Sequence, residues 1–257
     1  MQMAVSRALR RLKAVWRRHA ARARVVLCLA IVSACTLALL YPVSNARAAN
    51  EQAPLLATSL LQRMAEAGDL ATRRATEAAP DSTLVFSRQP DVSAAVFNRV
   101  VHGATDDQAR ADAIADALRQ LDPVRATKDL LARYGLSGDN LADVMAAYWV
   151  NSWEVVSEGA STDAVPSGRA MLAVEGSLKQ ALLENAALPK LSDAQKQAMA
   201  DSMIYQSVLA SAAAESMGKT PDPARRAAFI DQVNAPFAAA GVDLRQLSLT
   251  EEGFIRR

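Results

Sequence analysis

The chain has 257 residues and a formal net charge of +2, and this charge is divided unevenly along it. Nine of the 29 basic residues and none of the 27 acidic residues lie in residues 1–48, so residues 49–257 carry 20 basic against 27 acidic side chains. A net acidic region without a basic run offers no electrostatic surface to nucleic acid, which excludes that class of partner.

Residues 1–48 have the pattern of a secretory signal peptide. A basic stretch precedes the apolar run of residues 25–41, and Ala46-Arg47-Ala48 then supplies the small residues that a signal peptidase reads, which predicts cleavage after Ala48. We therefore expect a periplasmic or secreted protein.

Two alternatives to a cleaved signal stay open. Val32-Ser33-Ala34-Cys35 has the form of a lipoprotein processing site, although the apolar run continues beyond it. Without cleavage, residues 25–41 would anchor the protein in the inner membrane, although about 17 apolar residues are at the lower limit for a bilayer span. In either case contact with a membrane is expected only through this N-terminal segment.

Residues 49–83 are expected to form an N-terminal helix or a loosely attached segment, because a leucine-rich piece at residues 55–61 is followed by a polar stretch. Residues 84–257 are expected to form one helical domain. Alanine and leucine dominate there, alternation of β-branched residues is almost absent, and every predicted loop is short. Both cysteines, Cys28 and Cys35, precede this region, so it forms no internal disulfide.

Capping residues predict the boundaries of the helices. Starts are expected at Thr105–Gln108, Asp122–Pro123, Asp139, Ser192–Gln195 and Asp222–Pro223, and ends at Leu121, Gly135, Gly159, Gly218 and Gly241. Residues 166–187 should be helical too. The fold class is therefore all-α: a single bundle of about six to seven helices.

A packed, extended C-terminal tail completes the predicted fold. Leu247 and Leu249 alternate with polar residues, and Phe254 adds a large ring, so this end has more apolar surface to bury than a frayed terminus would. We expect the three side chains to pack on the helices and Arg256 and Arg257 to remain in solvent.

The segment AYWVNSWEVV, residues 147–156, contains the two tryptophans of residues 49–257. On a helix, Trp149 and Trp153 continue an apolar stripe, and a buried tryptophan contributes enough to favour a position in the core. The alternative is a groove that binds a partner protein or a small hydrophobic ligand. Its candidate residues are Tyr148, Trp149, Asn151, Trp153 and Glu154.

Acidic residues are the only abundant candidates for catalysis. Asp143, Asn151, Glu154 and Glu158 share one stripe of the same helix, so a metal-independent hydrolase acting on an envelope substrate is compatible with the residue types. Like charges one turn apart are mildly unfavourable, which favours a solvent-facing stripe. Convergence of these groups in a cleft, with raised pKa values, would favour the enzyme.

Other chemistries lack their residues. His102 is the single histidine of residues 49–257 and lies near a helix end, so a multi-histidine metal site is excluded. Ser216-Met217-Gly218-Lys219 matches Ser-x-x-Lys but lies where a helix ends rather than starts. No glycine-rich phosphate loop and no EF-hand spacing occur. We therefore expect no cofactor, no metal and no identified catalytic residue.

A specific order of short motifs carries a family resemblance over about residues 84–255. The motifs are Tyr134-Gly135-Leu136, Asp139 to Asp143, Tyr148-Trp149, Trp153, Asp193 to Gln197, and Leu249 to Phe254. The sequence resembles a family of exported, uncharacterised bacterial proteins. The resemblance implies an all-helical domain of unknown function and supplies no catalytic residue. A non-catalytic binding or interaction protein is the favoured interpretation, with the hydrolase as the alternative.

Overall fold

Every α-helix of the described residues except α3 (Pro90–Ala104), which starts at a proline, begins where a polar side chain accepts a free N–H group of the first turn. The computed structural model describes residues 81–157, 166–185, 187–219 and 222–257. Its α-helices are α3 (Pro90–Ala104), α4 (Gln108–Leu121), α5 (Pro123–Ala132), α6 (Leu141–Val156), α7 (Gly168–Leu183), α8 (Asp193–Lys219) and α9 (Pro223–Ala239). The described part is mostly helical, which confirms the all-α prediction.

Several predicted caps are present in the structure. Asp122 and Asp222 each precede a proline and accept the N–H of the residue three positions on. Ser192 and Gln195 form a reciprocal capping box at the start of α8, with Gln195 Oε1 accepting the Ser192 N–H at 2.9 Å. These contacts depend only on neighbouring residues, which is why the sequence predicts them.

Two predicted starts are displaced by one or two residues. Asp107 rather than Thr105 caps α4, because its carboxylate accepts the Arg110 N–H. Asn140 rather than Asp139 caps α6 by accepting the Ala142 N–H. Asp139 is instead drawn into ion pairs with Arg88 and Lys128.

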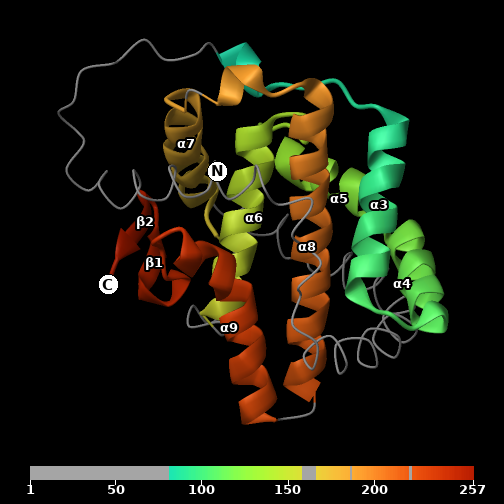
Figure 1. The fold of residues 1–257 in the computed structure, drawn as a ribbon. Coiled ribbons are helices and arrows are strands. Elements are labelled where there is room, and N and C mark those ends of the chain that lie inside the picture. Colours follow the sequence, from blue (N-terminus) through green and yellow to red (C-terminus); the bar gives the residue numbers. More distant parts are fainter. Residues whose placement is uncertain (1–80, 158–165, 186, 220–221) are drawn as a thin grey trace.

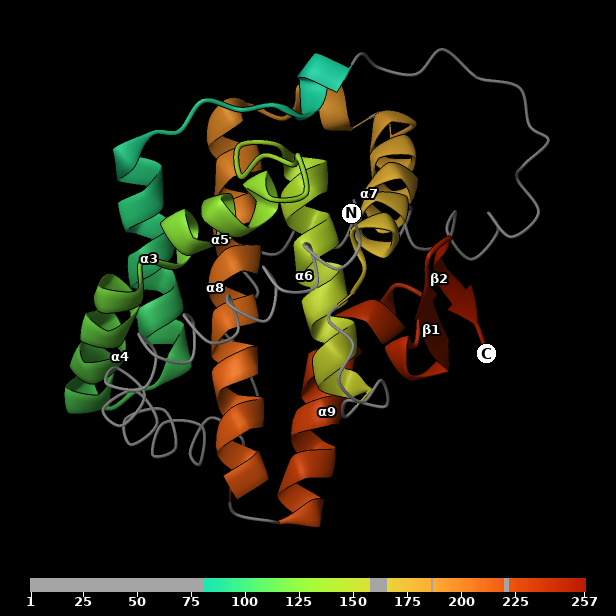
Figure 2. The same cartoon turned by 180° about the vertical axis from the view of Figure 1, so that it is seen from behind.

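Helix α6 is the central element (Figures 1 and 2). It packs against α7, α8 and α9, while α3 and α4 lie on the other side of the long helix α8. Eleven of its 16 residues are buried, so most of its circumference faces other elements. A second apolar cluster joins α3 and α4 to α8 around Ile114, Leu118 and Tyr205.

The C-terminus forms a small antiparallel hairpin. After the turn η5 (Leu244–Gln246), strand β1 (Leu247–Thr250) pairs with β2 (Gly253–Arg256), and Leu249 lies opposite Phe254. Leu247 is buried, Leu249 and Phe254 pack on the main core, and Arg256 and Arg257 are exposed. The packed, extended tail is thus confirmed, in the form of two strands joined by a tight turn. Gly253 has a φ of +100°, which the turn requires.

Residues 81–89 form a strap across the top of α8. Leu84 and Phe86 are buried, and the Phe86 N–H donates to the Asp139 carbonyl at 3.0 Å. Lys196 of α8 donates to the carbonyls of Thr83 and Val85. Most of the predicted segment 49–83 lies outside the described residues, as do residues 1–48, but its last three residues belong to the short helix η3 (Asp81–Leu84).

Within the described ranges, no helix is both long and apolar enough to cross a membrane.

Deleting residues 244–257 should lower the free energy of unfolding by several kcal/mol, since burying each large apolar side chain contributes about 1.5–3 kcal/mol. Circular dichroism melts of protein with and without these residues would measure the loss. Arg256→Ala, which removes only an exposed side chain of the hairpin, is the control and should leave the melting temperature nearly unchanged. Superimposable melts for the long deletion would show that the hairpin contributes nothing to stability.

Candidate functional site

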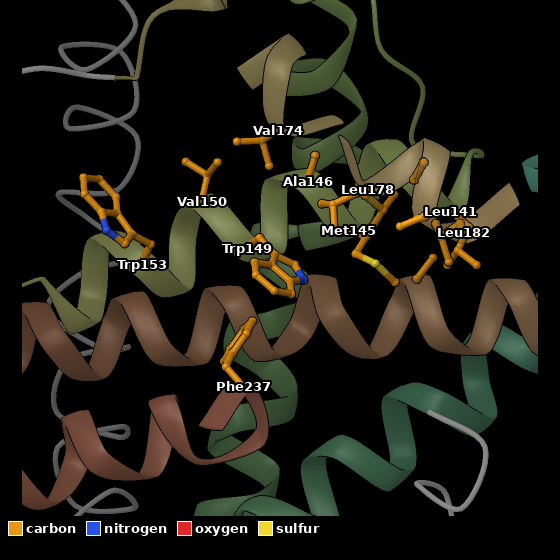
Figure 3. Close-up of a cluster of buried hydrophobic side chains, with 14 of the residues drawn as sticks. Leu141, Met145, Ala146, Trp149, Val150, Trp153, Val174, Leu178, Leu182 and Phe237 are labelled. Atoms are coloured by element: carbon orange, nitrogen blue, oxygen red, sulfur yellow. The ribbon is translucent and has the colours of Figure 1, made fainter. Parts of the chain in front are cut away.

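The two tryptophans of α6 lie in the main core (Figure 3). Trp149 is 4% exposed and Trp153 6% exposed. Trp149 meets Phe237 of α9 edge to face, with the ring centroids 5.0 Å apart. Phe254 of β2 approaches both indoles, at 6.2 Å from Trp149 and 6.0 Å from Trp153. Their burial confirms the core interpretation of these side chains, and the chain's own hairpin covers the face on which a groove was considered.

Trp153 also joins α6 to the hairpin by a hydrogen bond. Its indole N–H donates to the Leu247 carbonyl at 3.0 Å. The Arg257 N–H donates to the Gln246 carbonyl, so Leu247 and Arg256 form a non-hydrogen-bonded pair of the ladder. The Leu247 carbonyl therefore points away from β2. Trp153 therefore supplies a donor for the Leu247 carbonyl, which would otherwise be unpaired at the outer edge of β1.

Tyr148 and Asn151 also make internal contacts. Tyr148 stacks on Phe237 at 5.5 Å between centroids. Although Tyr148 keeps part of its surface accessible, burial raises its pKa to about 12, against a hydrogen bond with Ser152 that lowers it. The Asn151 amide donates to the Ser207 carbonyl at 3.2 Å and accepts from the Ser211 hydroxyl at 2.7 Å, which ties α6 to α8.

The prediction that the polar stripe of α6 faces solvent is therefore wrong for Asn151 and Asp143. Asn151 is held against α8, and Asp143 is only 5% exposed. The reason is that α7 and α8 cover the sides of α6 on which these two polar side chains lie. Glu154 is exposed, as expected, and Glu158 lies outside the described residues. Of the described members, Asp143 lies at the α7 side, Asn151 at α8 and Glu154 in solvent, so these three do not converge.

Asp143 instead meets Glu175, which α7 supplies. The Asp143 carboxylate accepts the Ser137 N–H at 2.6 Å, and a side-chain hydrogen bond joins it to Glu175. Burial raises the pKa of Asp143, while the contacts with Ser137, Glu175 and Lys179 lower it. Burial and the Asp143 charge raise the pKa of Glu175, so both carboxyl groups of the pair have raised pKa values.

Arg88 forms a second polar cluster at the start of α8. Its guanidinium donates to Asp201 at 2.5 Å, to Asp139 at 2.6 Å and to the Gly138 carbonyl at 2.9 Å. Asp201 is completely buried and accepts from Ser93 at 3.2 Å. Partial burial acts to raise the pKa of Asp139, but hydrogen bonds from Lys128 and Arg88 outweigh it and hold this pKa below its ordinary value.

Gln197 extends this cluster and is also completely buried. Its side-chain oxygen accepts the Gln89 N–H at 2.7 Å, and its amide nitrogen donates to the Gln89 carbonyl and to Ser93. The side-chain amide of Gln197 therefore pairs with both backbone groups of Gln89, as a neighbouring strand would, just before α3. The sequence marks Gln197 only as part of the motif Asp193 to Gln197 and does not mark Glu175, Arg88 or Asp201. The partners of all four lie on other elements, so no local pattern shows these contacts.

Other chemistry-bearing residues stand apart from these clusters. His102 is exposed in the last turn of α3, in agreement with a helix-end or surface role. Ser216 lies in the last turn of α8. No group of three or more His, Cys, Asp or Glu side chains in the described residues has the arrangement of a metal site.

Comparison with family models matches residues 16–257 to a family of unknown function (DUF6683). The match covers nearly the whole chain and includes all the motifs on which the resemblance rests. No curated protein and no solved structure matches the chain significantly. The match brings no catalytic or binding residue with it.

Trp153→Ala should destabilise the protein by about 3–5 kcal/mol, the range for large-to-small changes of a buried aromatic residue. Trp153→Phe keeps most of the apolar surface but leaves the Leu247 carbonyl without its donor, which should cost about 1–3 kcal/mol. Urea unfolding of both variants measures the two contributions. An unchanged unfolding midpoint in Trp153→Ala would contradict a structural role and favour a groove.

The Asp143–Glu175 pair should make stability depend on pH. Both pKa values are raised in the folded state, so the stabilisation is present below the ordinary glutamate value of 4.5 and is lost as pH rises through the raised values. Glu175→Gln keeps a hydrogen-bond donor without needing a proton, so this variant should gain stability relative to wild type as pH rises. The test is the difference in melting temperature between about pH 4 and pH 8.

Glu252→Gln is the control for this pH series, because Glu252 is exposed in the hairpin turn. If Glu175→Gln and Glu252→Gln follow the same pH profile, the pair does not share a proton in the folded protein.

Proposed function

We propose a function from the residues themselves, because the chain belongs to a family of unknown function (DUF6683). The protein is exported and acts without catalysis, by binding a partner protein in the cell envelope or outside the cell. Its helical domain presents a surface for recognition, and its interior is specialised for stability.

This proposal rests on one observation: the polar side chains inside the domain hydrogen-bond to other segments of the same chain. Asn151 joins α6 to α8, Asp201 neutralises Arg88, and Gln197 replaces a backbone partner of the strap. A catalytic group must be able to reach a substrate, and its hydrogen-bonding capacity must be available for the reaction. These groups are buried or half-buried, and their capacity is spent on holding segments together.

Exposed apolar side chains favour recognition of another protein. Leu172 of α7 is 45% exposed and Ile255 of β2 is 49% exposed. The two elements are in contact, and Gly253 of β2 lies against Ala173 of α7. Apolar surface of this kind contributes to protein interfaces.

Export is supported by the N-terminal sequence. The basic head, the apolar run of residues 25–41 and Ala46-Arg47-Ala48 follow one another in the order of a secretory signal. The absence of cysteine after Cys35 is compatible with an oxidising compartment, since no thiol of the domain remains to be oxidised there.

The Asp143–Glu175 pair is the one observation that favours the alternative, a metal-independent hydrolase. A carboxyl group that holds a proton beside a carboxylate is the arrangement used in acid–base catalysis. Asp143, however, is 5% exposed, and one of its oxygens accepts the Ser137 N–H. The pair therefore suits the contact between α6 and α7 better than attack on an external substrate.

The proposal predicts a cross-linked complex that contains the processed protein. Cross-linking in intact host cells, followed by purification and mass spectrometry, should yield an N-terminal peptide beginning at Ala49 and peptides of one recurrent partner attached to the domain. An exported helical protein of similar size serves as the control for chance proximity. A lipid-modified Cys35 or retention of residues 1–48 would contradict cleavage, and cross-links identical to the control's would contradict a specific partner.

A further inference from the structure

We propose that Asp143, Glu175 and Lys179 form a proton-controlled latch for η3, the first turn of the strap. With a proton between the two carboxyl groups, Lys179 binds Asp81 of η3 and holds this turn on α7. Without that proton, Lys179 binds Glu175 of its own helix, and η3 loses its ion pair with α7. The latch therefore couples the acidity of the surroundings to the attachment of the strap.

The first half of the latch is the contact between α6 and α7. Asp143 of α6 is 5% exposed, and its carboxylate accepts the Ser137 N–H at 2.6 Å. A side-chain hydrogen bond joins Asp143 to Glu175 of α7. Ionised carboxylates have no donor, so two carboxyl groups form such a bond only when one of them holds a proton. Loss of that proton removes the bond and leaves two negative charges facing each other.

The second half is the contact between α7 and η3. Lys179 pairs with Asp81, and the two elements touch. Because Glu175 and Lys179 are four positions apart on α7, their side chains lie on the same face of the helix. The charges of Asp81, Glu175 and Asp143 all act on the Lys179 ammonium group. One cation is therefore attracted both to the strap and to the carboxyl pair.

Deprotonation shifts the balance of these attractions toward Glu175. Lys179 is 31% exposed and Asp81 67% exposed, so water screens their attraction, and exposed pairs of this kind contribute little. Asp143 is buried and Glu175 partly buried, so the attraction of a cation to these two carboxylates is screened less. The ammonium group therefore leaves Asp81 when both carboxyl groups are charged.

The direction of the pH dependence follows from the carboxyl pair. Burial raises the pKa of Asp143 and that of Glu175, and the Asp143 charge raises the pKa of Glu175 further. The proton is therefore retained above the ordinary values of 3.8 and 4.5 and is lost as pH rises through the raised values. The latch is closed on the acidic side of this range and open on the alkaline side.

Other charged groups of the elements around the latch have partners of their own or lie in solvent. They are Arg169 with Glu251 at the start of α7, Lys128 with Asp139 before α6, Lys196 with Asp193 on α8, and the exposed Arg256 of β2 and Lys190 of η4 (Leu188–Lys190). Lys179 is the cation that contacts Asp81 and also acts on the Asp143–Glu175 pair.

Opening of the latch affects only the first residues of the strap. Leu84 is completely buried, and Lys196 binds the carbonyls of Thr83 and Val85. These contacts do not involve Asp81, so they remain when Asp81 is released. The first fixed residue of the strap is then Thr83.

Two backbone amides distinguish local release from a larger opening. The Val85 N–H donates to the Ser82 carbonyl at 3.3 Å across η3, whereas the Phe86 N–H donates to the Asp139 carbonyl at 3.0 Å beyond it. Release of Asp81 loosens η3 and weakens the Val85 hydrogen bond. The Phe86 hydrogen bond stays intact.

Hydrogen exchange of the full chain, followed residue by residue by mass spectrometry, measures both amides. A protection factor compares each amide with an unstructured chain at the same pH, which removes the pH dependence of exchange itself. From about pH 5 to about pH 8, the protection factor of Val85 should fall by about fivefold, at the lower end of couplings between two sites. The protection factor of Phe86 should not change.

Three variants assign this fall to the latch. Glu175→Gln keeps a donor for its partner and removes the competing charge, so Val85 should stay protected at both pH values. Lys179→Met and Asp81→Asn each break the ion pair and should keep the protection factor of Val85 at its low value throughout. Glu252→Gln, in the exposed turn of the hairpin, is the control and should follow the wild type.

A Val85 protection factor that does not change with pH in the wild type would overturn the inference, as would a fall that persists in Glu175→Gln. An equal fall for Phe86 would overturn it too, because more than η3 would then open. If Glu175→Gln fails to fold, Lys179→Met decides the question. A wild-type pH profile in Lys179→Met would show that the cation does not exchange partners, which also overturns the latch.

Discussion

The ion pair between Arg88 and Asp201 is the constraint on which the arrangement of the N-terminal half depends. Asp201 is completely buried, and an unpaired carboxylate in that position would be strongly destabilising. Its partner comes from the strap, and the same guanidinium reaches Asp139 and the Gly138 carbonyl before α6. One cation thus fixes three segments relative to each other, so α3, α6 and α8 must assemble together. Such a pair contributes more to the choice of one arrangement than to net stability, because desolvation offsets much of its attraction.

Helix α6 organises the other half by hydrophobic contact. Its apolar residues face α7, α8 and α9, and the aromatic rings of Trp149, Phe237 and Phe254 fill the space where these elements and the hairpin meet. The hairpin is too small to be stable alone, since two strands in water are marginal. Its apolar residues pack on the main core, and the Trp153 indole N–H donates to the Leu247 carbonyl of β1. The helices and the C-terminal hairpin therefore share one hydrophobic core.

The sequence predicts the local features of this protein well and the long-range polar contacts poorly. The capping box of Ser192 and Gln195 involves residues three positions apart, and helical periodicity alone indicates burial of the tryptophans. Arg88 and Asp201 are separated by 113 positions, so no pattern in either segment marks their pairing. Asp143 is predicted to face solvent because it shares a stripe of its helix with Asn151, Glu154 and Glu158. The residue that changes this assignment, Glu175, belongs to another helix.

The strap determines how a pulling force applied at residue 81 enters the domain. Tension applied at residue 81 is transmitted first to Lys196 and Gln197, which bind the strap's backbone, and to the buried side chains of Leu84 and Phe86. These contacts lie along the first turns of α8 and must be broken together when the strap is pulled lengthwise. Force on that end therefore loads several bonds in parallel at the first turns of α8 before it reaches α3.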